Sequence, residues 1–161
     1  MDSDKNNMTA GIIEDVLRSM GVEGAKVDVS AVSDGGKESS LFSITVDRKD
    51  SKILIGQHGV GLFSFQHLIQ TIIRRKTGAS PDFSVDVNRY WREKRSLLRR
   101  DAEEAARDAV ATGRPVSMRP MLPYERKIVH AALSENARVE TGSIGKGEDR
   151  KVVVKPKAVF S

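Results

Sequence analysis

Hydrophobic and polar residues follow two different periods along this chain, and together the periods predict a mixed α+β fold. Residues 9–20 ("TAGIIEDVLRSM") carry apolar side chains at helical spacing. Residues 25–32 ("AKVDVSAV") and 41–47 ("LFSITVD") alternate as strands do, and the glycine-containing polar stretch 34–40 between them is typical of a turn. The first part of the chain is therefore predicted to form a helix followed by a β-hairpin.

The next segment predicts two helices and a third strand. Residues 51–56 suit a short helical turn. Residues 61–77 ("GLFSFQHLIQTIIRRKT") place apolar side chains at i, i+3 and i+7, and Gly78 follows as a C-terminal stop. Residues 82–89 ("DFSVDVNR") alternate again. The predicted order of elements up to this point is α-β-β-α-α-β.

The second half predicts a long helix and a small α+β unit. Residues 90–112 are strongly charged and have only a narrow apolar stripe, so this helix is expected to bridge two small cores rather than fill one. Residues 114–121 are predicted to be extended, and Pro123 suits the first position of a helix that runs to about residue 135. Residues 137–157 are predicted to form two strands around a glycine-rich loop. The apolar stripe consists of Trp91, Leu98, Ala102, Ala105 and Ala109.

The charge of the chain is unevenly distributed. Residues 1–90 contain 11 Lys and Arg against 12 Asp and Glu, whereas residues 91–161 contain 16 against 10, so the net charge of +5 comes from the second half. Such asymmetry favours nucleic acid or another anionic partner. A basic surface that binds only water and salt explains the same charge equally well.

Composition excludes several classes of protein and of site. The chain has no cysteine, which excludes disulfides and thiolate metal sites. No apolar run approaches the roughly 18 residues of a membrane helix. The opening residues "MDSDKNN" are not followed by the apolar segment of a secretory signal. We therefore expect a cytoplasmic protein.

The stretch "ILIGQHGV" at residues 53–60 holds a Gly-x-x-Gly sequence directly before a predicted helix. Gly56 and Gly59 allow positive φ angles and the close approach of another chain to the backbone. A glycine-rich turn that opens a helix presents backbone N–H groups at the positive end of the helix dipole, and this arrangement suits phosphate. Gly-x-x-Gly is weak evidence by itself, because ordinary turns use glycine for the same reason.

A second candidate site lies on the helix predicted after Pro123. Arg126 and His130 are spaced i, i+4 and therefore share one face. Such a pair on a basic domain suits a contact with phosphate or with a base, although an ordinary solvated helix face is the commoner explanation. Leu133 falls on the same side, so the pair is expected to be only partly exposed. The opposite face, expected to be buried, consists of Tyr124, Ile128, Ala131 and Ala132.

Four segments in order resemble a known family. The segment "ILIGQHGVGLFSFQHLIQTIIRR" resembles a KH domain with its GxxG loop. The segments "MLPYERKIVHAAL", "VETGSIG" and "RKVVVKPK" resemble the R-three-H domain, which is named for an Arg and a His separated by three residues. A KH domain, a long helix, "TGRPV" and an R-three-H domain in this order are similar to the bacterial Jag family, also called SpoIIIJ-associated proteins. The likeness covers residues from about 9 to 157.

The resemblance implies a type II-like KH domain over residues 9–89 and a linking helix with a small α+β R-three-H domain over residues 90–161. Residues 1–8 are expected to be a disordered tail. Longer members of the family begin with an extra small domain and a charged linker, which are not found in this sequence, so a short form or a truncated chain is expected.

The resemblance further implies non-covalent binding of single-stranded RNA through two sets of residues, without a cofactor or metal. In KH domains the GxxG loop clamps the nucleic-acid backbone beside an apolar groove for about four nucleotides. Gln57 and His58 lie where family members often have a basic residue, which implies a weaker contact here. The implied contact residues are Ile55, Gly56, Gln57, His58, Gly59 and Leu62 in the KH domain, and Arg126, Lys127, His130, Arg150 and Lys151 in the R-three-H domain.

Other functions fit the sequence less well than RNA binding. An enzyme is disfavoured, because the three histidines form no HExxH or metal-ligand pattern and no complete phosphate-binding P-loop occurs. Aromatic residues make up only 5% of the chain and leave few stacking platforms, so a protein–protein adaptor is the main alternative, with single-stranded DNA binding as another. The family implies a role in post-transcriptional regulation of bacterial cell elongation and division. It also implies a second small KH-domain protein or a homodimer as candidate partners.

Overall fold

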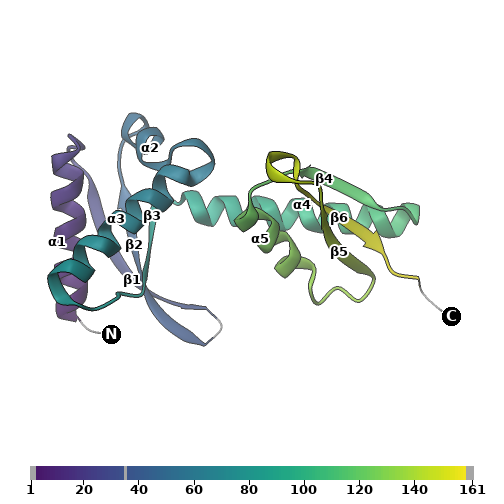
Figure 1. The fold of residues 1–161 in the computed structure, drawn as a ribbon, viewed down its shortest axis with the longest axis horizontal. Helices are drawn as coiled ribbons and strands as arrows, with labels where there is room; N and C mark the ends of the chain where they lie inside the picture. The colour runs from purple at the N-terminus through teal and green to yellow at the C-terminus, as the bar shows by residue number, and fades with distance from the viewer. Residues whose placement is uncertain (1–2, 35, 159–161) are drawn as a thin grey trace. The chain divides into compact units, whose positions relative to one another are not determined.

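The computed structural model describes residues 3–34 and 36–158 and forms two compact units, Met1–Trp91 and Arg92–Ser161 (Figure 1). Each unit has its own three-stranded sheet and its own buried core. The α+β fold class predicted from the sequence is therefore confirmed.

The first unit contains the predicted α-β-β-α-α-β order. Its sheet has the order β1-β2-β3, in which β1 and β2 pair antiparallel and β2 and β3 pair parallel. A parallel pair cannot be joined by a short turn, and the two helices α2 and α3 provide the crossover between β2 and β3. The elements are α1 (Ser3–Ser19), β1 (Lys26–Asp34), β2 (Lys37–Thr45), α2 (Arg48–Ile55), the 3-10 turn η1 (Gln57–Gly59), α3 (Val60–Thr77) and β3 (Phe83–Val87).

The first helix begins earlier than the sequence pattern predicted. Residues 3–8 were expected to lie in a disordered tail, but α1 starts at Ser3; residues 1 and 2 lie outside the described residues. A contact distant in sequence explains the difference, because Asn6 accepts a hydrogen bond of 2.9 Å from the hydroxyl of Ser40 on β2. Thr9, one turn further along the helix, is buried as well. The polar first turns of α1 are therefore attached to the sheet.

The core of the first unit lies between its sheet and the helices α1 and α3. Phe83, Val85 and Val87 of β3 point inward as their alternation predicted. Phe42 and Phe83 meet edge to face with their ring centroids 5.4 Å apart. The largest fully buried apolar side chains of this core are those of Ile13, Leu17, Phe42, Ile44, Leu54, Leu62, Ile69, Val85 and Val87.

The second unit packs two helices against an antiparallel sheet of order β4-β6-β5. The helix α4 starts in the first unit, where Tyr90 and Trp91 pack against the first core, and its later residues Leu98 to Ala109 line the second core. The predicted stripe on this helix is confirmed from Leu98 onward, with Ala106 in addition. The elements are α4 (Tyr90–Thr112), β4 (Val116–Pro120), α5 (Pro123–Leu133), β5 (Val139–Ile144), η2 (Gly147–Asp149) and β6 (Lys151–Pro156).

The buried face of α5 differs from the predicted one. Glu125, Val129 and Leu133 are buried at i, i+4 and i+8, whereas Ala131, which was expected inside, is exposed. Apolar residues occur on more than one side of this short helix, so its pattern left the choice of face open. Val129 and Leu133 occupy the core, and Ile128 and Ala132 of the predicted face are only partly buried against it.

Candidate nucleic-acid interface

The Gly-x-x-Gly loop joins α2 to α3 through two glycines with positive φ. Gly56 has φ +67° and its N–H donates to the carbonyl oxygen of Lys52, which ends α2. Gly59 has φ +81° and occupies the N-cap position of α3, where no side chain caps the helix. The first N–H groups of a helix have no partner within the helix and attract anions. The Val60 N–H, however, already donates to the carbonyl oxygen of Gln57, so the backbone geometry suits a phosphate group only at the N–H groups after Val60.

A third glycine, which the sequence pattern did not single out, makes this loop compact. A Cβ atom added to Gly56 would lie 2.9 Å from the backbone nitrogen of Gly61, and one added to Gly61 would lie 2.7 Å from the carbonyl oxygen of Leu54. Side-chain atoms do not approach backbone so closely, so both positions require glycine. The only signal in the sequence was a further glycine two residues after the motif.

Gly59 lies beneath two aromatic rings from the start of α4. A Cβ atom at this position would come within 2.6 Å of Trp91 and 2.8 Å of Tyr90. Phe63, one turn along α3, places its ring centroid 4.7 Å from that of Trp91, and the rings of Tyr90 and Trp91 are 5.0 Å apart. We call Phe63, Tyr90 and Trp91 the aromatic cluster. Sequence reasoning missed it, because Phe63 lies on a different helix from the other two rings and far from them along the chain.

The remaining predicted residues of this loop differ in accessibility. The side chains of Gln57 and His58 are exposed, and His58 adopts φ 54° at the tip of the loop. Ile55 is half-buried and packs against the first core. Leu62, which was expected to line an exposed groove, is completely buried in that core. It lies three residues after Gly59 on the inner face of α3, so a direct contact with a ligand is excluded for it in this conformation.

Two polar side chains hold the start of α4 in place. One oxygen of the buried Asp86 carboxylate accepts hydrogen bonds of 2.9 Å from the N–H groups of Val87 and Trp91. The side-chain amide of Asn88 both accepts from the N–H and donates to the carbonyl of Val46, at 3.0 Å each. These bonds fix the turn between β3 and α4, and with it the position of Tyr90 and Trp91 over the Gly-x-x-Gly loop.

In the second unit, the structure brings Arg126 close to the start of β6. The Arg126 guanidinium donates to the carbonyl oxygen of Met121 at 2.8 Å, and the Met121 N–H donates to the carbonyl oxygen of Arg150 at 3.1 Å. Lys151 pairs with Pro120 on β4 and with Ile144 on β5. We call Arg126, Arg150 and Lys151 the basic edge. These three predicted residues therefore meet at one end of the sheet.

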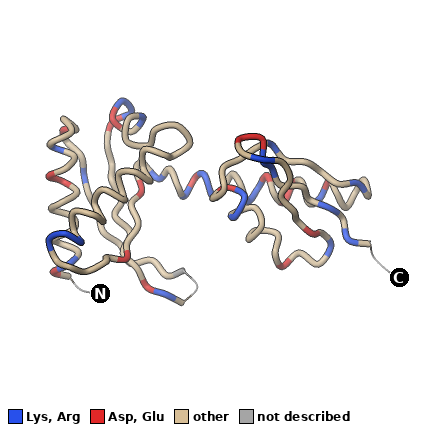
Figure 2. Tube along the Cα trace, in the orientation of Figure 1, with Lys and Arg blue, Asp and Glu red and all other residues tan. Residues whose placement is uncertain are grey.

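Other charges accompany the basic edge. Lys127 is exposed on α5, next to Arg126 in sequence. Figure 2 shows acidic and basic positions side by side in the loop between β5 and β6, which contains Glu148 and Asp149 directly before Arg150. The positive charge at this end of the sheet is therefore partly offset by neighbouring carboxylates.

His130 is held on both sides by hydroxyl groups of β5. Its Nδ1 lies 2.7 Å from Oγ1 of Thr141 and its Nε2 lies 2.9 Å from Oγ of Ser143. Burial of the ring, and to a smaller extent the charge of Arg126, lowers the pKa of His130 below its ordinary value of about 6.5. The ring is therefore neutral at pH 7, and it positions α5 on β5. The hydroxyls were missed in the sequence, where their only signal was an i, i+2 spacing on a strand.

Arg126 and His130 are both half-buried, as the sequence predicted, but their roles differ. Both ring nitrogens of His130 are hydrogen-bonded to hydroxyl groups. The Arg126 guanidinium has five N–H groups, of which one donates to Met121 in the part of the chain that the structure describes. Arg126 therefore retains donors for a further anionic partner. His130 would first have to break its hydrogen bond to Thr141 or to Ser143.

The start of α5 is stabilised by a buried carboxylate. Glu125 is 2% exposed; its Oε2 accepts the Leu122 N–H at 2.8 Å, and its Oε1 lies 2.8 Å from Nζ of Lys94 and 3.6 Å from Arg119. Burial raises the pKa of Glu125, but the hydrogen bonds from Lys94 and the Leu122 N–H, with the charges of Lys94 and Arg119, outweigh it, so the pKa is lowered overall. Glu125 thus provides the polar cap that Leu122 cannot supply.

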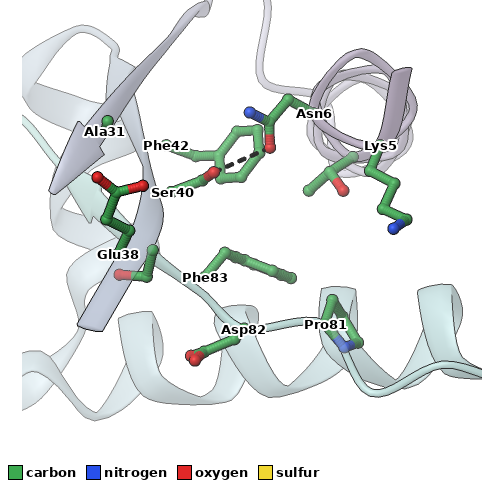
Figure 3. A pocket seen from close by; sticks show the side chains of 11 residues that line it. Lys5, Asn6, Ala31, Glu38, Ser40, Phe42, Pro81, Asp82 and Phe83 are labelled. Atoms are coloured by element: carbon green, nitrogen blue, oxygen red, sulfur yellow. Dashed lines mark hydrogen bonds between the residues drawn. The ribbon is translucent and has the colours of Figure 1, made fainter. Parts of the chain in front are cut away.

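A pocket of about 260 Å³ in the first unit lies apart from these residues (Figure 3). It is formed by the first turns of α1, the distal part of the β1–β2 hairpin and the start of β3. Figure 3 shows Phe83 facing this space and the hydrogen bond between Asn6 and Ser40 at its border. None of the predicted contact residues lines it. The pocket is therefore not part of the candidate interface.

Within residues 3–34 and 36–158, no helix combines the length and apolar character needed to cross a membrane. Across the same described ranges, no three His, Cys, Asp or Glu side chains are grouped so that they could hold a metal ion.

Comparison with known proteins identifies relatives for most of the chain. Residues 96–156 match the R-three-H domain family. The chain is 35% identical over 139 residues to "RNA-binding protein KhpB" of Lactiplantibacillus plantarum, an alignment that covers 86% of this chain and 41% of the relative. It is 32% identical over 113 residues to the protein of that name from Clostridium symbiosum, covering 70% and 51% of the two chains. It is 30% identical over 123 residues to the Bacillus subtilis protein of that name, an alignment that covers 75% of this chain and 58% of the relative. The chain thus spans about half the length of these relatives.

Proposed function

Since this chain contains an R-three-H domain and is homologous over most of its length to the bacterial KhpB proteins of the Jag family, we propose that it binds single-stranded RNA. The homology supports the class of function, because the relatives carry the name of RNA-binding proteins. The residues that make the contact are proposed from the geometry of each unit.

The basic edge is the observation that carries this proposal. Among the described residues Arg126 donates to the Met121 carbonyl, which orients its planar group while other donors remain for a partner. Arg150 and Lys151 add positive charge at the same end of the sheet. Phosphate contacts of this kind position a strand without selecting its sequence.

The Gly-x-x-Gly loop is proposed as a second contact. The uncapped start of α3 and the positive φ angles of Gly56 and Gly59 support the approach of a phosphate to backbone N–H groups. The exposed side chains of Gln57 and His58 would lie next to that phosphate. In this proposal the mechanism is non-covalent, and the R-three-H domain supplies most of the electrostatic attraction because the first 90 residues have a net charge of −1.

Salt dependence of RNA binding tests the proposal. The wild type, Arg126→Gln and Arg114→Gln would be titrated with a labelled single-stranded RNA pool over a series of salt concentrations. Arg114 is a matched control, because it is exposed and precedes β4 at the end opposite to Pro120. Each phosphate neutralised on a single strand adds about 0.7 to the slope of log K against log salt. Arg126→Gln is expected to lower the affinity and reduce the slope by about that amount, and Arg114→Gln to change neither.

Two further arms complete the test. Gln57→Asp with His58→Asp keeps both glycines and places negative charge on the loop, so it is expected to weaken binding if the loop contacts phosphate. A labelled single-stranded DNA pool of the same length measures the preference for RNA. Absence of binding by the wild type, or a salt slope near zero, would contradict the proposal and favour a protein adaptor.

We also propose that RNA binding serves post-transcriptional regulation of cell elongation or division. This part rests on the resemblance to the Jag family, which also suggests a second small KH-domain protein or a second copy of this chain as partner. A strain whose own gene carries Arg126→Gln should show altered transcript levels together with altered cell length. Normal cell length in that strain, with RNA binding lost in vitro, would refute the regulatory role and leave RNA binding intact.

A further inference from the structure

The aromatic cluster concentrates a scarce type of residue at one place in the first unit. The whole chain has one Trp, two Tyr and five Phe. Phe63, Tyr90 and the single Trp91 lie together, with ring-centroid distances of 4.7 Å for Phe63 to Trp91 and 5.0 Å for Tyr90 to Trp91. Phe63 is 47% exposed, although a phenylalanine ring gains from burial. The Phe63 ring is tilted by 50° to that of Trp91, and an exposed ring packed against a second ring in this way suits a flat ligand.

The position of the cluster is fixed by specific bonds. The Asp86 carboxylate accepts the Trp91 N–H, and the Asn88 side chain fixes the preceding turn to Val46. The absence of a side chain at Gly59 lets Trp91 and Tyr90 approach the backbone of the Gly-x-x-Gly loop. Both the loop and the rings are therefore held in one arrangement before any ligand binds. Such pre-organisation lowers the entropic cost of binding.

We propose that Phe63, supported by Trp91, stacks against a base of the single strand whose backbone contacts the Gly-x-x-Gly loop. This inference rests on the proposed RNA binding and names an additional contact residue for it. Phe63 lies one helical turn after Gly59, so a base on its ring belongs to a nucleotide next to the phosphate at the start of α3. Aromatic stacking accepts every base, because every base has a π-face.

Continuity with the loop favours a base over an apolar protein segment as the occupant. The rings lie against Gly59, a buried residue of the loop whose exposed neighbours are proposed to contact phosphate. Ile53 and Val60 are also exposed nearby in sequence, and apolar side chains of this kind suit a protein partner. A ligand that carries both a phosphate and a flat ring uses the loop and the aromatic cluster together. Protein association through Phe63 is the outcome that would overturn this choice.

Abasic RNA separates stacking from phosphate contact. The full chain would be titrated with a single-stranded RNA and with an abasic strand of equal length, which has the same charge but no bases. Phe63→Leu is expected to lower the affinity for normal RNA about tenfold, within the range known for base–aromatic stacking, and to leave the affinity for abasic RNA unchanged. Phe63→Tyr keeps the ring and should retain the wild-type affinity.

Two internal controls are available. Leu68 is 46% exposed on the same helix, so Leu68→Ala removes exposed apolar surface outside the aromatic cluster and should not change either affinity. Trp91 is the only tryptophan, so its fluorescence reports on this site alone. Its emission should change when normal RNA binds and not when abasic RNA binds.

The outcomes distinguish the two proposals. If normal RNA binds but Phe63→Leu weakens both strands equally or neither, stacking is refuted and RNA binding stands. If Phe63→Leu instead changes the sedimentation of the free protein, and its affinity does not differ between normal and abasic RNA, the surface is a protein interface. Stacking is then again refuted. If the wild type binds neither strand, both proposals fail.

Discussion

The indole of Trp91 lies directly against the backbone of Gly59, so closely that a Cβ atom on Gly59 would be 2.6 Å from its Cη2 atom. The two residues are far apart in sequence, and they join the start of α4 to the Gly-x-x-Gly loop. Two separate features therefore require glycine at position 59: its positive φ angle and the close approach of the Trp91 ring. The same contact places an aromatic surface beside the proposed phosphate site.

Gly59→Ala should destabilise the first unit more than Gly78→Ala. Both residues have positive φ, +81° and +71°, which costs an alanine about 1–2 kcal/mol. At Gly78 a Cβ meets nothing within 4 Å, whereas at Gly59 it overlaps Trp91 and Tyr90. Urea unfolding followed by Trp91 fluorescence measures the difference in the free energy of unfolding. Equal losses in the two variants would show that the rings move aside without cost.

Asp86→Ala should loosen the start of α4, whereas Asp86→Asn should be tolerated better. One carboxylate oxygen of Asp86 accepts hydrogen bonds from the N–H groups of Trp91 and Val87. The side-chain amide oxygen of asparagine can accept the same bonds, whereas alanine has no acceptor. Loss of a helix cap costs about 1 kcal/mol, within a range of roughly 0.5–2 kcal/mol. A red-shifted emission of Trp91 in the alanine variant, with near-normal emission in the asparagine variant, is the expected result. Identical spectra for the two variants would contradict the capping role.

Lys94→Met should destabilise the second unit strongly. Lys94 is 18% exposed and lies 2.8 Å from the buried Glu125, so its removal leaves a buried carboxylate with weaker compensation. Breaking a buried pair in this way costs about 3 kcal/mol. Arg119→Met is the matched control, because Arg119 is 50% exposed and 3.6 Å away, and exposed pairs contribute at most about 1 kcal/mol. Urea unfolding followed by far-UV circular dichroism compares them, and similar losses would disprove the ranking.

His130 should make the second unit less stable at mildly acidic pH. Its pKa is lower in the folded state than in the unfolded state, where it is about 6.5, so the unfolded chain binds the proton more readily. The contribution of His130 to stability is therefore complete above about pH 6.5 and is lost as the pH falls through the folded-state pKa.

The comparison with His130→Gln isolates this effect from that of the carboxylates. The difference in the free energy of unfolding between wild type and variant, measured from about pH 8 to about pH 5, should shrink as the pH falls. A difference that stays constant over this range would show that His130 titrates alike in both states.

Local pattern was sufficient for most of the fold. The α-β-β-α-α-β order, the long helix with its alanine stripe and the two strands around a glycine-rich loop were all predicted from apolar spacing, because the period of a helix or strand is a local property. Pro123 and Gly78 likewise marked helix ends through their own backbone preferences. Arg126 and His130 were placed on one helix for the same reason.

Local pattern failed where a contact distant in sequence decided the outcome. The tail predicted at residues 3–8 is helical because Asn6 bonds to Ser40, 34 residues away. The buried face of α5 could not be chosen from spacing, since apolar residues occur on more than one side. The family resemblance implied that Leu62 lines a groove, but its side of α3 faces the core.

The sequence by itself determined the elements, their order and the two candidate sites, because backbone preference and apolar period act over a few residues. Only the tertiary structure decided what those sites are made of. It set His130 between Thr141 and Ser143, where burial lowers the pKa of the ring, and left Arg126 with donors for a partner. It also placed Trp91 over Gly59. Such contacts depend on how distant segments pack, and no period within one segment encodes them.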